Sequence, residues 1–367
     1  MAADCDIVLL VYDKLELTRP CLESIIAHTP GPFRLTIVDN GSTQPQTLEY
    51  LASMQKRFPE YIRIARNEQN QGYIKAVNKG LSLSDRPFIC VISNDTLVFP
   101  GWLSEMLSAA RQSPAVGLVN PQWEFPARFG ARLDVWAARL RKRYAGQSAE
   151  TDWARGFCFL VRREVINAIG GLDEAFSPGY FDDWDFAVRA VKKGYICKVA
   201  LAAFVRHYIN ATFGPQLGKQ GMDRLFEERR QMFLRKWGRP LRICQVADHR
   251  SSGRTAAVGT ALALLRDQNR LVLITDDPAI GIRHTNCVVK RAPGWMLWIK
   301  LAANLLNNLR YQKTKRYDMI ICSRQMMNRM CALPWLRREF LFVVHEAGGA
   351  QPQGFWRLIQ QLKQKTA

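Results

Sequence analysis

Short apolar runs alternate with longer amphipathic stretches over residues 6–200. Runs of four or five apolar residues are typical of buried strands, and apolar residues repeated every three or four positions are typical of helices. The expected strands are 7–11, 35–38, 61–64 and 88–92, and the expected helices are 17–27, 72–81 and one from about residue 102. This alternation predicts an α/β fold with a mostly parallel sheet covered by helices.

The alternation begins again after Gly238-Arg239-Pro240. The expected strands are 241–246, 271–275, 318–322 and 340–344, with one helix ending near residue 265 and another at 295–309. We therefore predict two domains, residues 1–238 and a smaller Rossmann-like α/β domain at 240–367.

Two predicted helical segments contain residues that could contact a partner or a membrane. In residues 133–144, apolar positions recur at helical spacing among arginines, which fits either core packing with a solvated cationic face or contact with an anionic acceptor or membrane. In residues 295–309, Trp295, Trp298, Leu301 and Leu305 are expected on one face, and the segment is too short to span a membrane.

The formal net charge of +20 suits an anionic partner such as nucleic acid, a phosphate-bearing substrate or a membrane face. Residues 241–367 hold 20 Lys and Arg against 7 Asp and Glu, a net of +13, and the other residues hold 32 against 25, a net of +7. A nucleic-acid-binding protein is one hypothesis, but no known nucleic-acid motif is visible.

The nine cysteines form no C-x-x-C pair, and most lie in apolar runs, as Cys90 does. This pattern indicates buried free thiols in a reducing compartment. The N-terminus lacks a basic segment followed by an apolar one, and no apolar run approaches about 18 residues. We therefore expect a cytoplasmic protein.

Polar residues follow three of the predicted strands, and ligands bind at the carboxyl ends of such strands. Asp39 lies in the turn Asp39-Asn40-Gly41-Ser42, where its carboxylate could accept hydrogen bonds from a ribose or a base, although this is also an ordinary turn. Gly72 and Lys75 lie at the start of a predicted helix, where the glycine lets the backbone approach a ligand and the lysine supplies a positive charge. This arrangement suits a diphosphate. Asn94 and Asp95 could hold a divalent cation and a ribose.

Three carboxylates fall within Phe181-Asp182-Asp183-Trp184-Asp185-Phe186. Crowded carboxylates raise one another's pKa, and such crowding is usually tolerated where a metal, a cation or proton transfer uses it. The alternative is acidic capping of a helix N-terminus, which the helix dipole favours.

The order of these segments carries a resemblance. The matching motifs are Val38-Asp39-Asn40-Gly41-Ser42, Asn70-x-Gly72, Asn78-x-Gly80, Asn94-Asp95-Thr96, Gly156, Gly170-Gly171-Leu172-Asp173, Phe181-Asp182-Asp183-Trp184-Asp185 and His207. In this order, residues 6–213 resemble the family 2 glycosyltransferases, which have the GT-A nucleotide-diphospho-sugar transferase fold. The sequence departs from the family at Asn94, where many relatives carry Asp, and Leu97 excludes a literal Asp-x-Asp.

The resemblance implies a role for each matching residue. The donor would contact Tyr12, Asp39, Asn70, Gly72, Lys75, Asn94 and Asp95. Asp95 and His207 would bind a divalent cation, Mn²⁺ or Mg²⁺, although a lone histidine is also often a packed polar residue. Asp183 would be the general base. Asp182, Trp153 and Gly156 would line the acceptor side, where Trp153 is as readily a core residue.

The resemblance thus implies an inverting, metal-dependent glycosyltransferase. It would move a sugar from a nucleotide-sugar donor to a hydroxyl of a glycan or lipid-linked glycan in cell-surface polysaccharide synthesis, without binding nucleic acid. The alternative is a catalytically weak or inactive glycan-binding scaffold within a multi-domain glycosyltransferase.

The C-terminal segment resembles, more faintly, the first half of a GT-B glycosyltransferase, through the loop at Gly253 and through His345-Glu346-Ala347-Gly348-Gly349. It would be a non-catalytic or incomplete domain. With its basic surface and Trp295 and Trp298, it is expected to allow peripheral contact with the inner face of the cell membrane.

Overall fold

The computed structural model describes residues 4–31, 33–126, 132–208, 214–248, 253–312, 315–344 and 353–364. The chain forms two compact units, Met1–Arg230 and Gln231–Ala367. Residues 249–252 and 345–350, which carry part of the resemblance of the C-terminal segment, lie outside the described residues.

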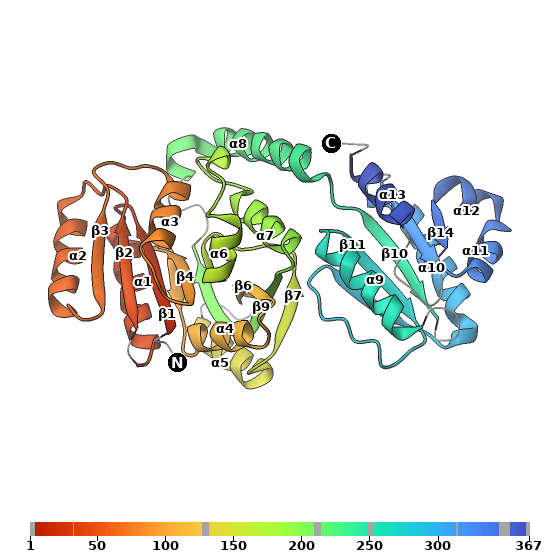
Figure 1. Cartoon of the computed structure of the whole chain (residues 1–367), viewed down its shortest axis with the longest axis horizontal. Coiled ribbons are helices and arrows are strands. Elements are labelled where there is room, and N and C mark those ends of the chain that lie inside the picture. Colours follow the sequence, from red (N-terminus) through yellow and green to blue (C-terminus); the bar gives the residue numbers. More distant parts are fainter. Residues whose placement is uncertain are drawn as a thin grey trace. The chain divides into compact units, whose positions relative to one another are not determined.

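The elements of the N-terminal unit alternate between strand and helix (Figure 1). Its strands are β1 (Cys5–Val11), β2 (Arg34–Asp39), β3 (Ile62–Arg66), β4 (Phe88–Ser93), β5 (Thr96–Val98), β6 (Val116–Gln122), β7 (Ser148–Thr151), β8 (Cys158–Arg162) and β9 (Ile196–His207). Its helices are α1 (Leu15–His28), α2 (Pro45–Arg57), α3 (Tyr73–Ser82), α4 (Trp102–Arg111), α5 (Leu133–Tyr144), α6 (Arg163–Ile169), the 3₁₀ helix η3 (Glu174–Phe176) and α7 (Asp182–Lys192). Helix α8 (Gly214–Trp237) begins in this unit.

The strands form one mixed sheet in the order β3-β2-β1-β4-β8-β6-β9-β5, with β7 paired to β9. Strands β1 to β4 are parallel to one another, whereas β8 runs antiparallel to both β4 and β6. The predicted α/β class with a largely parallel sheet is confirmed. The parallel strands all end at one edge, which brings together the segments that follow β1, β2 and β4.

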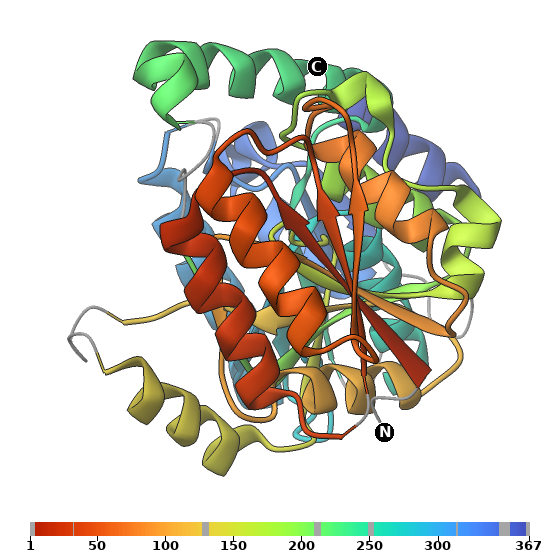
Figure 2. The ribbon, with the colours of Figure 1, turned by 90° about the vertical axis from the view of Figure 1, so that its left-hand side faces the viewer.

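Helices cover both faces of this sheet. Alternate residues of β1, including Ile7 and Leu9, pack with buried residues of α1, α2 and α4. Val8 faces the other side, where a Cβ added to Gly80 of α3 would lie 2.3 Å from its Cγ1. Figure 2 shows α1 and α2 side by side across the same face. The sheet is therefore buried on both faces, which explains the continuous apolar runs of β1 and β4.

Helix α5 packs with its apolar side inward. Ala137 and Leu140 are buried with Phe204 of β9, and Trp136 and Tyr144 pack partly against them. The core-packing interpretation thus holds for Ala137 and Leu140, whereas Val135 is 38% exposed. The arginines of the helix, Arg139, Arg141 and Arg143, are exposed.

The second unit is a smaller parallel sheet in the order β12-β11-β10-β13-β14. Its strands are β10 (Arg242–Ala247), β11 (Arg270–Thr275), β12 (Cys287–Arg291), β13 (Met319–Cys322) and β14 (Phe342–Val344). Its helices are α9 (Arg254–Arg266), the 3₁₀ helix η4 (Gly294–Met296), α10 (Leu297–Leu309), α11 (Arg324–Cys331), α12 (Pro334–Glu339) and α13 (Gln353–Gln364). Helices α9 and α13 cover one face, and α10, α11 and α12 cover the other.

The expected single apolar face at 295–309 is wrong. Leu301 and Leu305 are fully buried against the sheet, but Trp295 is 73% exposed and Trp298 is 41% exposed. Trp295 lies in η4, before α10 begins, so it does not follow the rotation of the α-helix. Within the described part of the chain, no helix is long and apolar enough to cross a bilayer.

Seven of the nine cysteines are buried, and Cys287 and Cys331 are partly exposed. The thiols therefore behave largely as small apolar side chains of the two cores, as the apolar runs predicted.

Candidate active site

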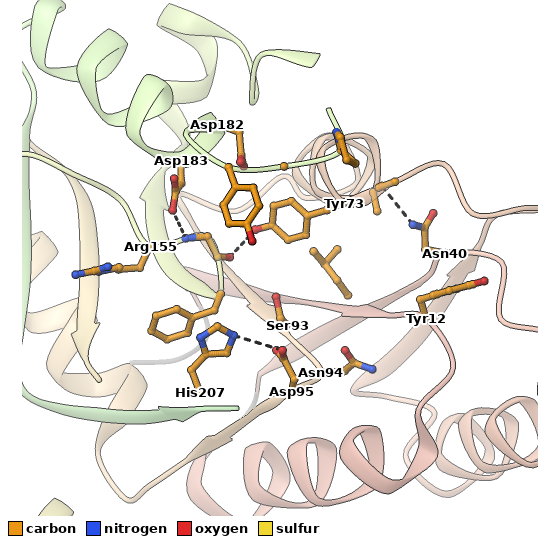
Figure 3. Close-up of a pocket in the computed structure, with 18 of the residues that line it drawn as sticks. Tyr12, Asn40, Tyr73, Ser93, Asn94, Asp95, Arg155, Asp182, Asp183 and His207 are labelled. Atoms are coloured by element: carbon orange, nitrogen blue, oxygen red, sulfur yellow. Dashed lines mark hydrogen bonds and ion pairs between the residues drawn. The ribbon is translucent and has the colours of Figure 1, made fainter. Parts of the chain in front are cut away.

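A cavity of about 730 Å³ opens at the carboxyl ends of β1, β2 and β4 (Figure 3). Its lining includes many of the residues singled out in the sequence: Tyr12, Asn70, Gly72, Asn94, Asp95, Gly156, Asp182, Asp183 and His207. It also includes Asn40, Tyr73, Trp123, Arg155 and Phe157, and Leu225 and Phe226 from α8. The fold therefore gathers segments spread over more than 200 residues around one cavity.

Asn40 organises one wall of the cavity. Its Nδ2 donates to Asn70 Oδ1 at 2.9 Å and to the Gly72 carbonyl at 3.2 Å, and its Oδ1 accepts from Asn67 Nδ2 at 2.8 Å. The next residue, Gly41, has a positive φ, and a Cβ there would lie 2.4 Å from the backbone of Gln69. The turn after β2 is therefore packed directly on the loop before α3.

Asp39, by contrast, is turned away from the cavity. Its Oδ2 pairs with Arg66 Nη1, and its Oδ1 accepts from the Ser42 N–H at 2.9 Å. Arg66 also donates to the Ser42 carbonyl at 2.7 Å. In this arrangement, the Asp39 carboxylate holds the turn. Lys75, on the exposed side of α3, is likewise outside the cavity lining.

Asp95 and His207 meet across β5 and β9, which pair antiparallel. Asp95 Oδ2 lies 3.3 Å from His207 Nε2, and the His207 ring stacks on Phe157 with centroids 4.5 Å apart. Asp95 Oδ1 is buried without a hydrogen-bond partner in the described structure. An orphaned buried carboxylate oxygen beside an imidazole nitrogen fits a divalent cation.

These two side chains would supply two ligands to such a cation. Within the described residues, no group of three or more His, Cys, Asp and Glu side chains is arranged to hold a metal. Further ligands would therefore come from a bound diphosphate and water.

Asn94 does not join this pair. Its Nδ2 donates to Thr18 Oγ1 at 2.8 Å and approaches the Asp13 carbonyl at 3.4 Å, and Figure 3 shows its side chain turned away from Asp95. Asp13 and Lys14 both have positive φ angles, which are uncommon for residues with a side chain. Asn94 thus holds the strained loop that follows Tyr12.

Asp183 lies in the first turn of α7 with both carboxylate oxygens bonded. Its Oδ2 accepts from the Gly156 N–H and its Oδ1 from the Trp184 N–H, both at 2.8 Å. Burial raises the pKa of Asp183, while these two bonds and the Arg155 guanidinium lower it, and the net direction is upward. A carboxylate with a raised pKa is suited to accept a proton near neutral pH.

Asp182 and Asp185 are fully inside the protein but differ in their partners. Burial and the charges of Asp183 and Asp185 raise the pKa of Asp182, whose Oδ2 has no hydrogen-bond partner in the described structure. Asp185 instead accepts from Arg189 Nε at 2.7 Å, one helical turn away. Asp182 and Asp183 thus face the cavity, and Asp185 belongs to an internal ion pair.

Aromatic rings surround this end of the cavity. Trp153 stacks on Trp184 with centroids 5.8 Å apart, and Phe181 contacts both Trp184 and Phe226 of α8. Trp153 is therefore behind the lining, where it supports Trp184. The Arg155 guanidinium lies over the rings of Trp123 and Trp153, at 4.9 and 4.7 Å.

Sequence reasoning missed Asn40 and Tyr73 as cavity residues. Asn40 was visible beside Asp39 in the same turn, and turn amides commonly bond neighbouring backbone. Tyr73 directly follows Gly72, at the first position of α3, but nothing in the sequence indicated that its hydroxyl reaches Gly156.

Comparison with known proteins finds relatives for the N-terminal part of the chain. Residues 6–170 match the family model described as glycosyl transferase family 2. An uncharacterized protein of Sinorhizobium fredii, y4gI, is 28% identical over 207 residues, covering 52% of this chain and 23% of that protein. The O-antigen biosynthesis protein RfbC of Myxococcus xanthus is 27% identical over 191 residues, covering 46% of this chain and 14% of that protein.

A third relative is the N-acetylglucosaminyl-diphospho-decaprenol L-rhamnosyltransferase of Mycobacterium tuberculosis, 26% identical over 238 residues, covering 55% of this chain and 75% of that protein. Among solved structures, a mannosyltransferase of Pyrobaculum calidifontis in complex with GDP-Man and Mn²⁺ is 15% identical with a TM-score of 0.47, covering 62% of this chain and 64% of that one. The N-terminal unit thus carries a glycosyl transferase family 2 segment at residues 6–170.

Proposed function

We propose that the N-terminal unit transfers a sugar from a nucleotide-sugar donor to a hydroxyl of a glycan or lipid-linked glycan, with inversion at the anomeric carbon. The observation that carries the proposal is the cavity shared by Asp183 and the Asp95–His207 pair, in a chain with a family 2 segment. The relatives named for rhamnosyl transfer and O-antigen biosynthesis support a role in cell-surface polysaccharide synthesis.

The proposed chemistry divides between the two ends of the cavity. Asp183 would remove the proton from the acceptor hydroxyl, whose oxygen attacks the anomeric carbon from the face opposite the departing nucleotide. Asp182 would help to orient the acceptor. Tyr12, Asn70 and Gly72 would contact the donor, and Asp39 and Lys75 would contribute there only if donor binding rearranged them.

Asp95 and His207 would hold a divalent cation, Mn²⁺ or Mg²⁺. When bound, such a cation supplies positive charge to the diphosphate leaving group. Because Asn94 is neutral, the Asp95–His207 pair contributes a single carboxylate. This favours a cation site that needs the bound donor for its remaining ligands over a site that binds metal strongly without the donor.

The test is transfer from a panel of UDP-, dTDP- and GDP-sugars, with Mn²⁺ or with a chelator. Asp183→Asn should lower the transfer rate by about 100- to 10,000-fold while sugar-nucleotide binding is retained, and His207→Ala should weaken Mn²⁺-dependent donor binding. Asp134→Asn is the matched control, because Asp134 is an exposed carboxylate of α5 outside the cavity. Binding without any transfer by the unaltered protein would favour the scaffold alternative, and salt-sensitive DNA binding without sugar-nucleotide binding would exclude the enzyme.

We also propose that the second unit makes a peripheral contact with the inner face of the membrane. Its support is the net charge of +13 in residues 241–367 and the exposure of Trp295 and Trp298. Co-sedimentation with anionic vesicles should fall in a Trp295→Ala/Trp298→Ala variant. Equal sedimentation of both proteins would exclude this contact.

A further inference from the structure

The backbone of Gly156 is held on both sides of its Cα. Tyr73 Oη donates to the Gly156 carbonyl at 2.5 Å, and the Gly156 N–H donates to Asp183 Oδ2 at 2.8 Å (Figure 3). Tyr73 is the first residue of α3, Gly156 precedes β8, and Asp183 is in the first turn of α7. Gly156 therefore joins two adjacent peptide units, the Arg155–Gly156 unit that donates to the acceptor-side carboxylate and the Gly156–Phe157 unit that accepts from the donor-side helix.

This connection orients the carboxylate relative to the rest of the cavity. The bond from Trp184 N–H to Asp183 Oδ1 lies within α7 and moves with that helix. The bond from Gly156 ties Asp183 to a different segment, and Tyr73 fixes that segment in turn. Loss of the Tyr73 hydroxyl would release the Gly156 carbonyl, and rotation about the glycine Cα would then shift the Gly156 N–H relative to Asp183 Oδ2.

The residue types fit this role. Burial and the neighbouring carboxylates of Asp182 and Asp183 raise the pKa of Tyr73, so its hydroxyl remains a hydrogen-bond donor. A Cβ at Gly156 would lie 3.2 Å from Tyr73 Oη and 3.4 Å from Asp183 Oδ2. Glycine thus allows both groups to approach the backbone on either side of one Cα.

We propose that Tyr73 is a positioning residue for Asp183, acting through the backbone of Gly156. The inference rests on the proposed role of Asp183 as the base. Tyr73 need not touch the reacting atoms. Its contribution is to hold the carboxylate where an acceptor hydroxyl can reach it, because small misplacements of a reacting group are costly.

Tyr73→Phe removes the hydroxyl and keeps the ring. We expect kcat to fall by about ten- to a hundredfold, with the donor KM little changed. The charged groups that face Asp183 are Asp182 on α7 and Arg155 beside Gly156, and neither is altered. A weaker Gly156 bond stabilises the carboxylate less, so the pKa of Asp183 rises and the acid limb of the rate profile moves to higher pH.

The experiment compares pH–rate profiles of the full chain, Tyr73→Phe and a matched control, Tyr50→Phe. Tyr50 is buried on α2 outside the cavity, and its hydroxyl has no partner within the described residues. The control should match the unaltered protein in kcat and in its pH profile. Unchanged kcat and pH profile in a folded Tyr73→Phe protein would overturn the inference while leaving the proposed function intact.

A second measurement does not depend on activity. In protein labelled with ¹³C at the aspartate carboxyl carbons, the Asp183 signal is assigned by its loss in Asp183→Asn and then titrated by NMR. Its midpoint should lie at higher pH in Tyr73→Phe than in the unaltered protein. Identical midpoints would overturn the positioning role whether or not a donor sugar has been found.

Discussion

Asn94 occupies the position where many family members carry Asp, so Asn94→Asp tests which way this side chain faces. In the structure, Asn94 is 7% exposed and donates from Nδ2 to Thr18 Oγ1 and toward the Asp13 carbonyl. Aspartate has no proton to donate when ionised. We therefore expect the substitution to destabilise the protein without creating a better metal site.

The size of the effect follows from these contacts. The Thr18 hydroxyl has one proton, which it already donates to the Asp13 carbonyl at 3.0 Å. It can donate to the introduced carboxylate only by giving up that bond, so at least one buried acceptor loses its partner. We expect a loss of about 2 kcal/mol in the free energy of unfolding. For a unit of this size, the corresponding fall in Tm is about 4–8 °C.

Thermal unfolding of the unaltered protein, Asn94→Asp, Thr18→Val and the double variant provides the assay. In the Thr18→Val background, Asn94→Asp should cost less, because the Thr18 bond is already absent. Mn²⁺ binding measured by calorimetry should not tighten in Asn94→Asp. An unchanged or higher Tm together with tighter Mn²⁺ binding would show that residue 94 faces the cation, which would refute this reasoning.

Three further predictions concern other parts of the protein. Gly156→Ala should lower kcat by about tenfold or more with little change in Tm, because its Cβ would lie 3.2 Å from Tyr73 Oη and so displace the hydroxyl that holds the Gly156 carbonyl; an unchanged kcat would contradict the proposed connection to Asp183. The pKa of Asp182 is raised in the folded state, so at pH values between the ordinary carboxyl pKa and this raised pKa the folded state binds more protons than the unfolded state. The free energy of unfolding therefore falls as pH rises between these two pKa values. In urea unfolding, the stability of Asp182→Asn relative to the unaltered protein should therefore be greater at pH 8 than at pH 4, and a pH-independent difference would contradict the shift. A thiol reagent should label Cys331 before Cys287, because burial raises the pKa of Cys287 to about 11, and the seven buried thiols should react only on unfolding; rapid labelling of more than two would contradict this.

Much of the fold could be predicted because its signals are local. The runs at 7–11 and 88–92 are apolar throughout because the sheet is covered on both faces, and the observed strands begin and end within two residues of the prediction. The face of the 295–309 helix could not be predicted equally well. Its N-terminal residues form a 3₁₀ turn, which has a different rotation per residue, and this leaves Trp295 outside the buried stripe.

For the candidate site, the sequence by itself determined which chemical groups follow each parallel strand. Asn40, Asp95 and their neighbours reach one edge because parallel strands end together. Only the tertiary structure decided where each group points. The contrasts between Asp39 and Asn40, and between Asn94 and Asp95, depend on hydrogen-bond partners supplied by distant segments: Arg66, Thr18 and His207. A side-chain direction is set by such long-range contacts, and neither local propensity nor residue spacing carries that information.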